Sequence, residues 1–172
     1  MSLHRLFEWL ADTPWSVELH ESLWAYPIIE SVHVLFLCLF LGLAVMFDLR
    51  LTGLSLRSMP VSKVYHRLLP WTQVGFVVMV LSGLLLLYGI PLRTYENIFF
   101  RIKAVLLVLA GLNVFVFHKG IYRSIAAWDD DPVPPARVRL AGYASMFLWA
   151  SIVIAGRMIA YNWFDKTQNP SG

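Results

Sequence analysis

Residues 26–47 read YPIIESVHVLFLCLFLGLAVMF, and this stretch decides the fold. A helix needs about 20 apolar residues to cross the hydrocarbon core of a bilayer. The stretch is that long and holds only two ionisable side chains, Glu30 and His33. Three further stretches of the same kind lie at about Trp71–Ile90, Ile98–His118 and Leu140–Phe164. The sequence therefore predicts an all-α integral membrane protein, a four-helix bundle.

The composition of the 172 residues excludes several classes of protein. Hydrophobic residues make up 58% and charged residues 15%, whereas soluble domains have about 45–50% apolar and about 25% charged residues. A chain this apolar and aromatic is not disordered. The single cysteine, Cys38, excludes an intrachain disulfide and a cysteine-rich metal site. The net charge of +3 indicates membrane orientation rather than nucleic-acid binding.

The chain also has a segment before the four spans and another after them. Residues 1–25 predict an outer amphipathic segment, because Leu3, Leu6, Phe7 and Leu10 share one helical face. Thr13 and Pro14 have the residue types of an N-cap and a first helical position, so a second surface helix is expected up to about Trp24. Residues 26–164 form the expected bundle and residues 165–172 a polar tail.

The distribution of Lys and Arg predicts how the chain is oriented. Eight lie in the connections after the first and third spans, namely Arg50, Arg57, Lys63, Arg67, Lys119, Arg123, Arg137 and Arg139. Four lie outside or at the edge of the other face, namely Arg5, Arg93, Arg101 and Lys166. Positive loops stay in the cytoplasm. We therefore expect both of these connections in the cytoplasm and both termini on the outer side of the membrane.

Ionisable residues within the spans point to a functional layer near the outer face. At a helical rise of about 1.5 Å per residue, His33 and Arg157 lie roughly 10 Å deep and Lys103 about 7 Å deep. Glu30 lies one turn above His33, and Arg101 is nearer the edge. Charges at such depth are costly, so they face the interior, pair or reach back to the interface. An interior partnership between Arg157 and Glu30 is expected.

A second polar layer is expected near the cytoplasmic face. It holds His66 and His118, and Asp48 and Arg50 are expected to form a salt-bridged helix end. The run Trp128-Asp129-Asp130-Asp131-Pro132 in the third connection is typical of a solvated turn.

The leading functional hypothesis is a b-type haem protein that transfers electrons. Helical bundles hold haem between facing helices with histidine as axial ligand. His33 is the candidate ligand to the metal, and Lys103, Arg101 and Arg157 are candidates for contacts with the haem propionates. Met158 or His20 could supply a second ligand, and His66 and His118 could form a separate pair. The expected partners are the lipid bilayer, a quinone, and a membrane or periplasmic redox protein.

Two alternatives remain open at this point. In one, the protein is a non-redox subunit in which Glu30, His33, Lys103 and Arg157 form a buried polar network. In the other, the outer layer is the pocket of a small transporter or binding protein, for an anion or for a metal at Glu30 and His33. A transporter with four spans implies a homo-oligomer. No phosphate-binding loop or hydrolase motif is present, and nucleic acid is not an expected partner.

Several short motifs resemble a bacterial four-span inner-membrane family of unknown function. The resemblance covers roughly residues 23–162 and implies a membrane location and a four-helix domain. More distantly, the chain resembles cytochrome b561 and copper-resistance D-type membrane domains. The motifs are Tyr26-Pro27 with Glu30-Ser31-Val32-His33, Phe47-Asp48-Leu49-Arg50-Leu51, Leu69-Pro70-Trp71, Asn97 with Phe100 and Lys103, Leu112-Asn113 with Phe117-His118, and Ala155-Gly156-Arg157.

Overall fold

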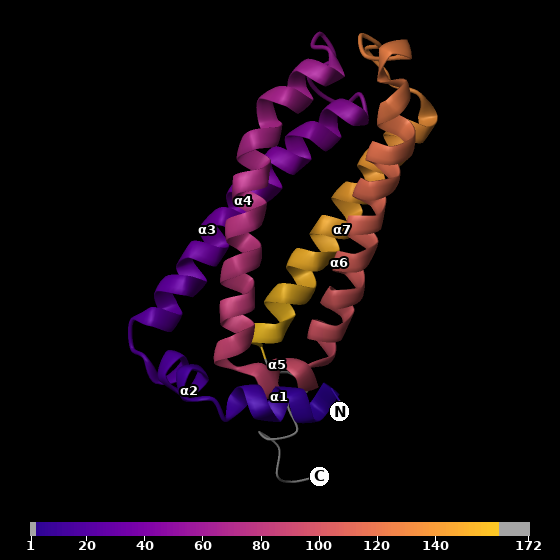
Figure 1. Cartoon of the computed structure of the whole chain (residues 1–172). Helices are drawn as coiled ribbons and strands as arrows, with labels where there is room; N and C mark the ends of the chain where they lie inside the picture. Colours follow the sequence, from indigo (N-terminus) through magenta and orange to yellow (C-terminus); the bar gives the residue numbers. More distant parts are fainter. Residues whose placement is uncertain (1–2, 162–172) are drawn as a thin grey trace.

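The computed structural model describes residues 3–161, and this part of the chain is helical throughout except for its connections (Figure 1). The four long helices confirm the predicted all-α bundle, and each is long and apolar enough to cross a membrane. The predicted tail at 165–172 and the end of the last predicted span lie outside the described residues. The elements are α1 (Leu3–Ala11), α2 (Pro14–Glu21), α3 (Ala25–Leu51), α4 (Val61–Gly89), α5 (Pro91–Glu96), α6 (Ile98–Val116), a π-helical turn (Phe117–Ile121), a 3-10 helix (Tyr122–Ala127) and α7 (Ala136–Ala160).

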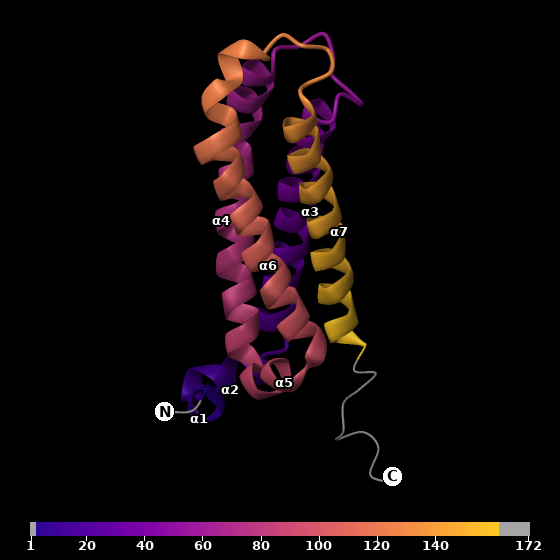
Figure 2. The same ribbon diagram turned by 90° about the vertical axis from the view of Figure 1, so that its right-hand side faces the viewer.

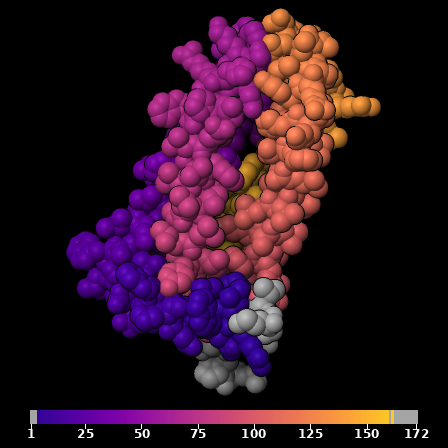
Figure 3. Space-filling view, in the orientation of Figure 1, coloured from indigo at the N-terminus to yellow at the C-terminus, as the bar shows by residue number. Residues whose placement is uncertain are grey.

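The long helices form two antiparallel pairs. α3 packs against α4, α6 packs against α7, and α3 also contacts α7 (Figures 1 and 2). Short connections make neighbouring helices antiparallel. In the described chain, α4 and α6 make at most marginal contact with each other. The space-filling view shows a hollow between them, with α7 visible behind it (Figure 3).

The second span begins earlier than predicted, at Val61 rather than at Trp71. Pro70 lies inside the helix. Val61 and Val64 are buried one turn apart, so this extra length of α4 contributes an apolar face to the bundle. Tertiary packing therefore overrides the cost of a proline within a helix.

The middle of the bundle is held by close packing of aromatic and small residues. Phe40 of α3 is buried against Trp149 of α7, with ring centroids 4.7 Å apart. At Gly75 of α4, an added Cβ would lie 3.2 Å from the backbone nitrogen of Phe40. Small residues of this kind let helices approach closely, which is how helices associate in lipid.

The end of the bundle that carries the two longer connections, the loop end, is fastened by Arg50. This side chain is fully buried at the end of α3. Its Nε donates to the carbonyl of Met59 at 2.7 Å, and its Nη2 donates to the carbonyls of Asp131 at 3.0 Å and Asp129 at 3.3 Å. Arg50 therefore ties α3 to both connections. The expected salt bridge with Asp48 does not form.

Asp129 fixes the start of α4, so the aspartate run is not simply the solvated turn that we expected. Its carboxylate accepts from the backbone nitrogen of Ser62 at 2.7 Å and from the hydroxyl of Ser62 at 2.6 Å. Its carbonyl also accepts from the nitrogen of Val61 at 3.0 Å. Carboxylates at a helix N-terminus satisfy exposed N–H groups. The aspartate run, which lies in the connection between α6 and α7, thus anchors the start of α4.

The other end of the bundle, the terminal end, carries α1, α2 and α5. The expected surface helices form, and α1 lies across the ends of the long helices (Figure 1). Phe7 stacks on Tyr95 of α5 with centroids 4.7 Å apart. Thr13 precedes α2 as expected, but its hydroxyl bonds to the phenol of Tyr88 at 2.7 Å instead of capping the helix.

Replacing Arg50 with Ala should destabilise the protein by about 3 kcal/mol, because hydrogen bonds to charged groups contribute about 1.5–3 kcal/mol each and the carbonyls stay buried. The measurement is unfolding in detergent, compared with Arg123→Ala, which changes an exposed arginine at the same end of the bundle. A loss no larger than that of the control would show that Arg50 does not fasten the loop end.

Candidate functional site

His33 is the best-defined of the candidate residues. It lies on α3, half-buried, and its Nδ1 is 3.0 Å from the hydroxyl oxygen of Ser82 on α4. The ring also packs on Gly83, where an added Cβ would lie 3.1 Å from its Cε1. Two neighbouring residues of α4 therefore set both the position and the rotation of the imidazole.

Hydrogen bonding assigns the tautomer of His33. The hydroxyl of Ser82 has a single hydrogen, and it donates this hydrogen to the carbonyl of Val78 at 2.7 Å. The oxygen of Ser82 must then accept from His33, so Nδ1 carries the proton. In a neutral imidazole with Nδ1 protonated, Nε2 holds the lone pair. No hydrogen bond to this Nε2 is found within residues 3–161, which leaves it open to a ligand.

Lys103 of α6 extends toward α7. Its Nζ would lie 3.4 Å from a Cβ added at Gly156, an ordinary packing distance that places the end of the side chain against α7. The side chain is partly buried, and its charge lies within electrostatic reach of His33. Within the described residues, Lys103 forms no ion pair. The half-buried ammonium therefore faces the site without a countercharge from the chain.

The remaining members of the expected outer layer point elsewhere. Arg157 is exposed, and its guanidinium lies over the ring of Tyr161 at 5.3 Å. Arg101 is also exposed, over Tyr95 at 5.3 Å. Glu30 is exposed as well, and in the described part of the chain no ion pair joins it to Arg157. Among the described residues, no hydrogen bond or ion pair joins any two of Glu30, His33, Lys103 and Arg157, but the charges of both Glu30 and Lys103 lie within electrostatic reach of His33.

The histidines at the loop end do not face each other. His118 has both ring nitrogens in use: Nδ1 donates to the carbonyl of Val114 at 2.9 Å, and Nε2 accepts from the phenol of Tyr65 at 3.0 Å. His66 is exposed and contacts the ring of Tyr65 at 5.4 Å. Tyr65 therefore occupies the nitrogen that an iron at His118 would need.

Sequence reasoning did not identify Ser82 as the partner of His33. It named Asp48, but with Arg50 as its partner. Asp48 is buried at 5% exposure, bonds to Ser145 of α7, and leaves its Oδ2 without a partner among the described residues. The sequence does carry a signal for Ser82. It stands next to Gly83 on a long apolar helix, so a hydroxyl group lies beside the space that a glycine leaves for a neighbouring side chain.

The number of side chains that could coordinate a metal limits what this site can bind. Residues 3–161 contain no group of three or more His, Cys, Asp or Glu side chains that could hold a metal ion. Structural and catalytic zinc sites use three or four protein ligands. One histidine with a free Nε2, beside a single ammonium, fits instead a ligand that brings its own metal ligands and a negative charge.

Replacing Lys103 with Met in protein prepared without added cofactor should leave stability unchanged or raise it by about 1 kcal/mol, because exchanging a buried charge for an apolar side chain is often neutral or stabilising. Unfolding in detergent measures this effect, with the exposed Arg101→Met as the matched control. A loss well beyond that of the control would mean that Lys103 belongs to an ion-pair network after all.

Comparison with known proteins identifies the family but not an activity. No curated protein and no solved structure matches the chain. The distant resemblance to cytochrome b561 and copper-resistance D-type domains therefore has no support. The family model that matches covers residues 18–162, a range that includes all four long helices and both His33 and Lys103. This multi-pass membrane protein thus belongs to a family of unknown function, DUF6644.

Proposed function

We propose that the protein binds b-type haem and transfers electrons within the membrane, with His33 as axial ligand through Nε2. The observation that carries this proposal is the hydrogen bond from Nδ1 of His33 to Ser82. Histidines that bind metals almost always donate their other ring N–H to a protein acceptor, which fixes tautomer and orientation. Ser82 supplies this acceptor from the neighbouring helix.

The number of ligands favours haem over a bare metal ion. The porphyrin supplies most of the iron's ligands itself, and one proximal histidine is enough to hold it in globins and peroxidases. His33 meets that need alone. His66 and His118 are then unnecessary as ligands, and the bond between His118 and Tyr65 favours a structural role for His118.

Lys103 supports the same proposal through charge. Haem carries two propionates, and charge-assisted hydrogen bonds to an ammonium are about twice as strong as neutral ones. The ammonium of Lys103 lacks a carboxylate partner within the described chain and acts on His33. Arg101 and Arg157 are exposed, so we assign them at most outer contacts with the propionates.

The chemistry that haem would supply is a one-electron change at iron. This chain would hold the iron through His33 and offset the propionate charge through Lys103. The excess of Lys and Arg in the longer connections supports an inner-membrane protein of bacteria with both termini on the periplasmic side. The site would then lie near the periplasmic face, where a quinone or a periplasmic redox protein could exchange electrons with it.

The absorbance spectrum of protein purified in mild detergent after expression with ample haem should contain a Soret band that shifts on reduction with dithionite. The substitution His33→Ala should abolish this band, because it removes the only protein ligand that we assign. His66→Ala changes an exposed histidine and should leave the band unchanged. A flat spectrum in the unmodified protein would overturn the haem proposal, as would a full band in the His33→Ala variant.

A further inference from the structure

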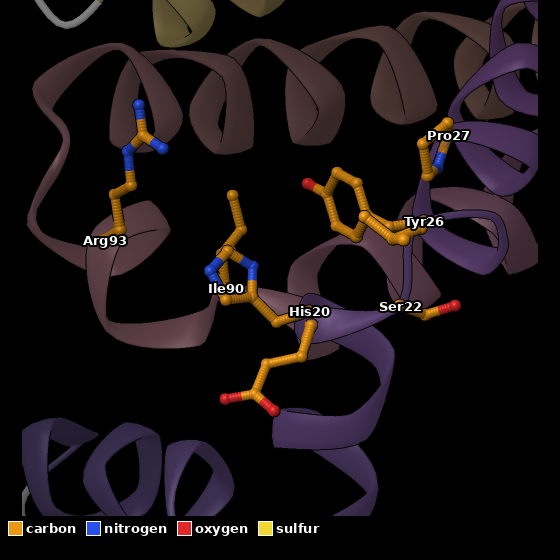
Figure 4. A pocket seen from close by; sticks show the side chains of 8 residues that line it. His20, Ser22, Tyr26, Pro27, Ile90 and Arg93 are labelled. Atoms are coloured by element: carbon orange, nitrogen blue, oxygen red, sulfur yellow. The ribbon is translucent and has the colours of Figure 1, made fainter.

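A second candidate site lies outside the bundle interior, at the terminal end. A pocket of about 300 Å³ opens where α2, α3, α4 and α5 meet. Its lining includes His20, Glu21, Tyr26, Ile90 and Arg93. Figure 4 shows the hydroxyl of Tyr26 pointing toward Ile90 and His20, with Arg93 on the far side of Ile90. The haem proposal assigns no role to these residues, and His20, considered from the sequence as a second haem ligand, lies in this pocket instead.

Packing builds this pocket. The ring of Tyr26 lies so close to Gly89 that an added Cβ there would be 2.9 Å from its Cε2. The hydroxyl of Ser22 accepts from the nitrogen of Ala25 at 3.0 Å and thereby fixes the turn between α2 and α3. The ring of His20 meets that of Tyr26 edge-on at 6.3 Å. The polar groups are therefore held in place by the fold.

The polar groups suit a phosphate. Arginine guanidinium groups bind phosphate oxygens in bidentate fashion, and Tyr26 and His20 add hydrogen-bonding groups to the lining across Ile90 from Arg93. The charge of Arg93 acts on the phenol of Tyr26, so the two lie within electrostatic reach. Glu21 adds a carboxylate to the lining. One guanidinium and one carboxylate match a zwitterionic headgroup, with phosphate toward Arg93 and ammonium toward Glu21.

The surroundings of the pocket indicate that the ligand comes from the bilayer. Trp24, which follows Leu23 of the lining, has 77% of its surface exposed. Tryptophan is enriched at the level of the lipid headgroups, where one part of the ring is apolar and another is wet. Leu23, Pro27 and Ile90 line the rest of the pocket, which suits the glycerol and upper acyl carbons of a lipid.

We propose that the pocket between Tyr26 and Arg93 is a binding site for the phosphate of a phospholipid headgroup, and that an amine-bearing headgroup fits it. The ligand holds α2 and α5 against the ends of α3 and α4. The site is independent of the haem proposal, because it lies among other residues and needs no metal.

Native mass spectrometry of the whole protein in detergent tests the proposal, with dihexanoylphosphatidylethanolamine as the probe. One lipid should bind, and Arg93→Gln should weaken the binding about tenfold because a charge-assisted contact is lost. Tyr26→Phe keeps the ring on Gly89 and should weaken it about threefold. Arg137→Gln, an exposed arginine at the loop end, is the matched control and should bind as the unmodified protein does.

Two outcomes would overturn the proposal. Equal binding of the lipid to the unmodified protein and to both the Arg93→Gln and Tyr26→Phe variants would mean that the pocket is not the site. Competition by inorganic phosphate at the same concentration as the lipid would mean that the pocket takes free phosphate rather than a lipid. Because Tyr26→Phe preserves the packing of the ring, misfolding of the Arg93 variant would leave the test intact.

Discussion

The buried guanidinium of Arg50 is the contact on which the arrangement of the helices depends. It joins the end of α3 to the connection between α3 and α4 and to the connection between α6 and α7. Asp129 of the second connection then holds the start of α4. Together, Arg50 and Asp129 connect the pair α3 and α4 to the pair α6 and α7 at the loop end. Further along, only α3 and α7 join the hairpins closely, through Phe40 and Trp149. A bundle fastened in this way leaves α4 and α6 apart, with His33 packed against α4 and the end of Lys103 packed against α7.

The cost of polar groups in lipid explains why this pair merits attention. A lysine at the centre of a helix costs about 2.5–3.5 kcal/mol on insertion scales, and chains usually offset the cost with a partner. Arg50 is offset by three carbonyls, and His118 by two hydrogen bonds. Lys103 forms no ion pair within the described chain. The fold thus compensates most of the Arg50 guanidinium, whose Nη1 alone lacks a partner among the described residues, and leaves the ammonium of Lys103 available for a ligand.

Much of the fold could be predicted from hydropathy, because each span exceeds the length that a bilayer requires. Helical rise also placed Glu30, His33, Lys103 and Arg157 at similar depths. Depth does not give the direction of a side chain around its helix, and small differences in rotation turned Glu30 and Arg157 outward. The start of the second span and the aspartate run were mispredicted for a related reason. Local hydropathy and charge suggested a later start and a wet turn, whereas contacts between distant segments, from Asp129 to Val61 and Ser62, fix the start of α4.

The tautomer of His33 is the most direct test of the account, because the proposed site needs Nε2 to be unprotonated. Nitrogen-15 NMR of histidine-labelled protein without haem measures it, with His33→Gln identifying the resonances and Ser82→Ala removing the acceptor. We predict a neutral ring with the proton on Nδ1, a preference that is lost in Ser82→Ala. A ring with the proton on Nε2, or one that is unaffected by the loss of the Ser82 hydroxyl, would contradict the account.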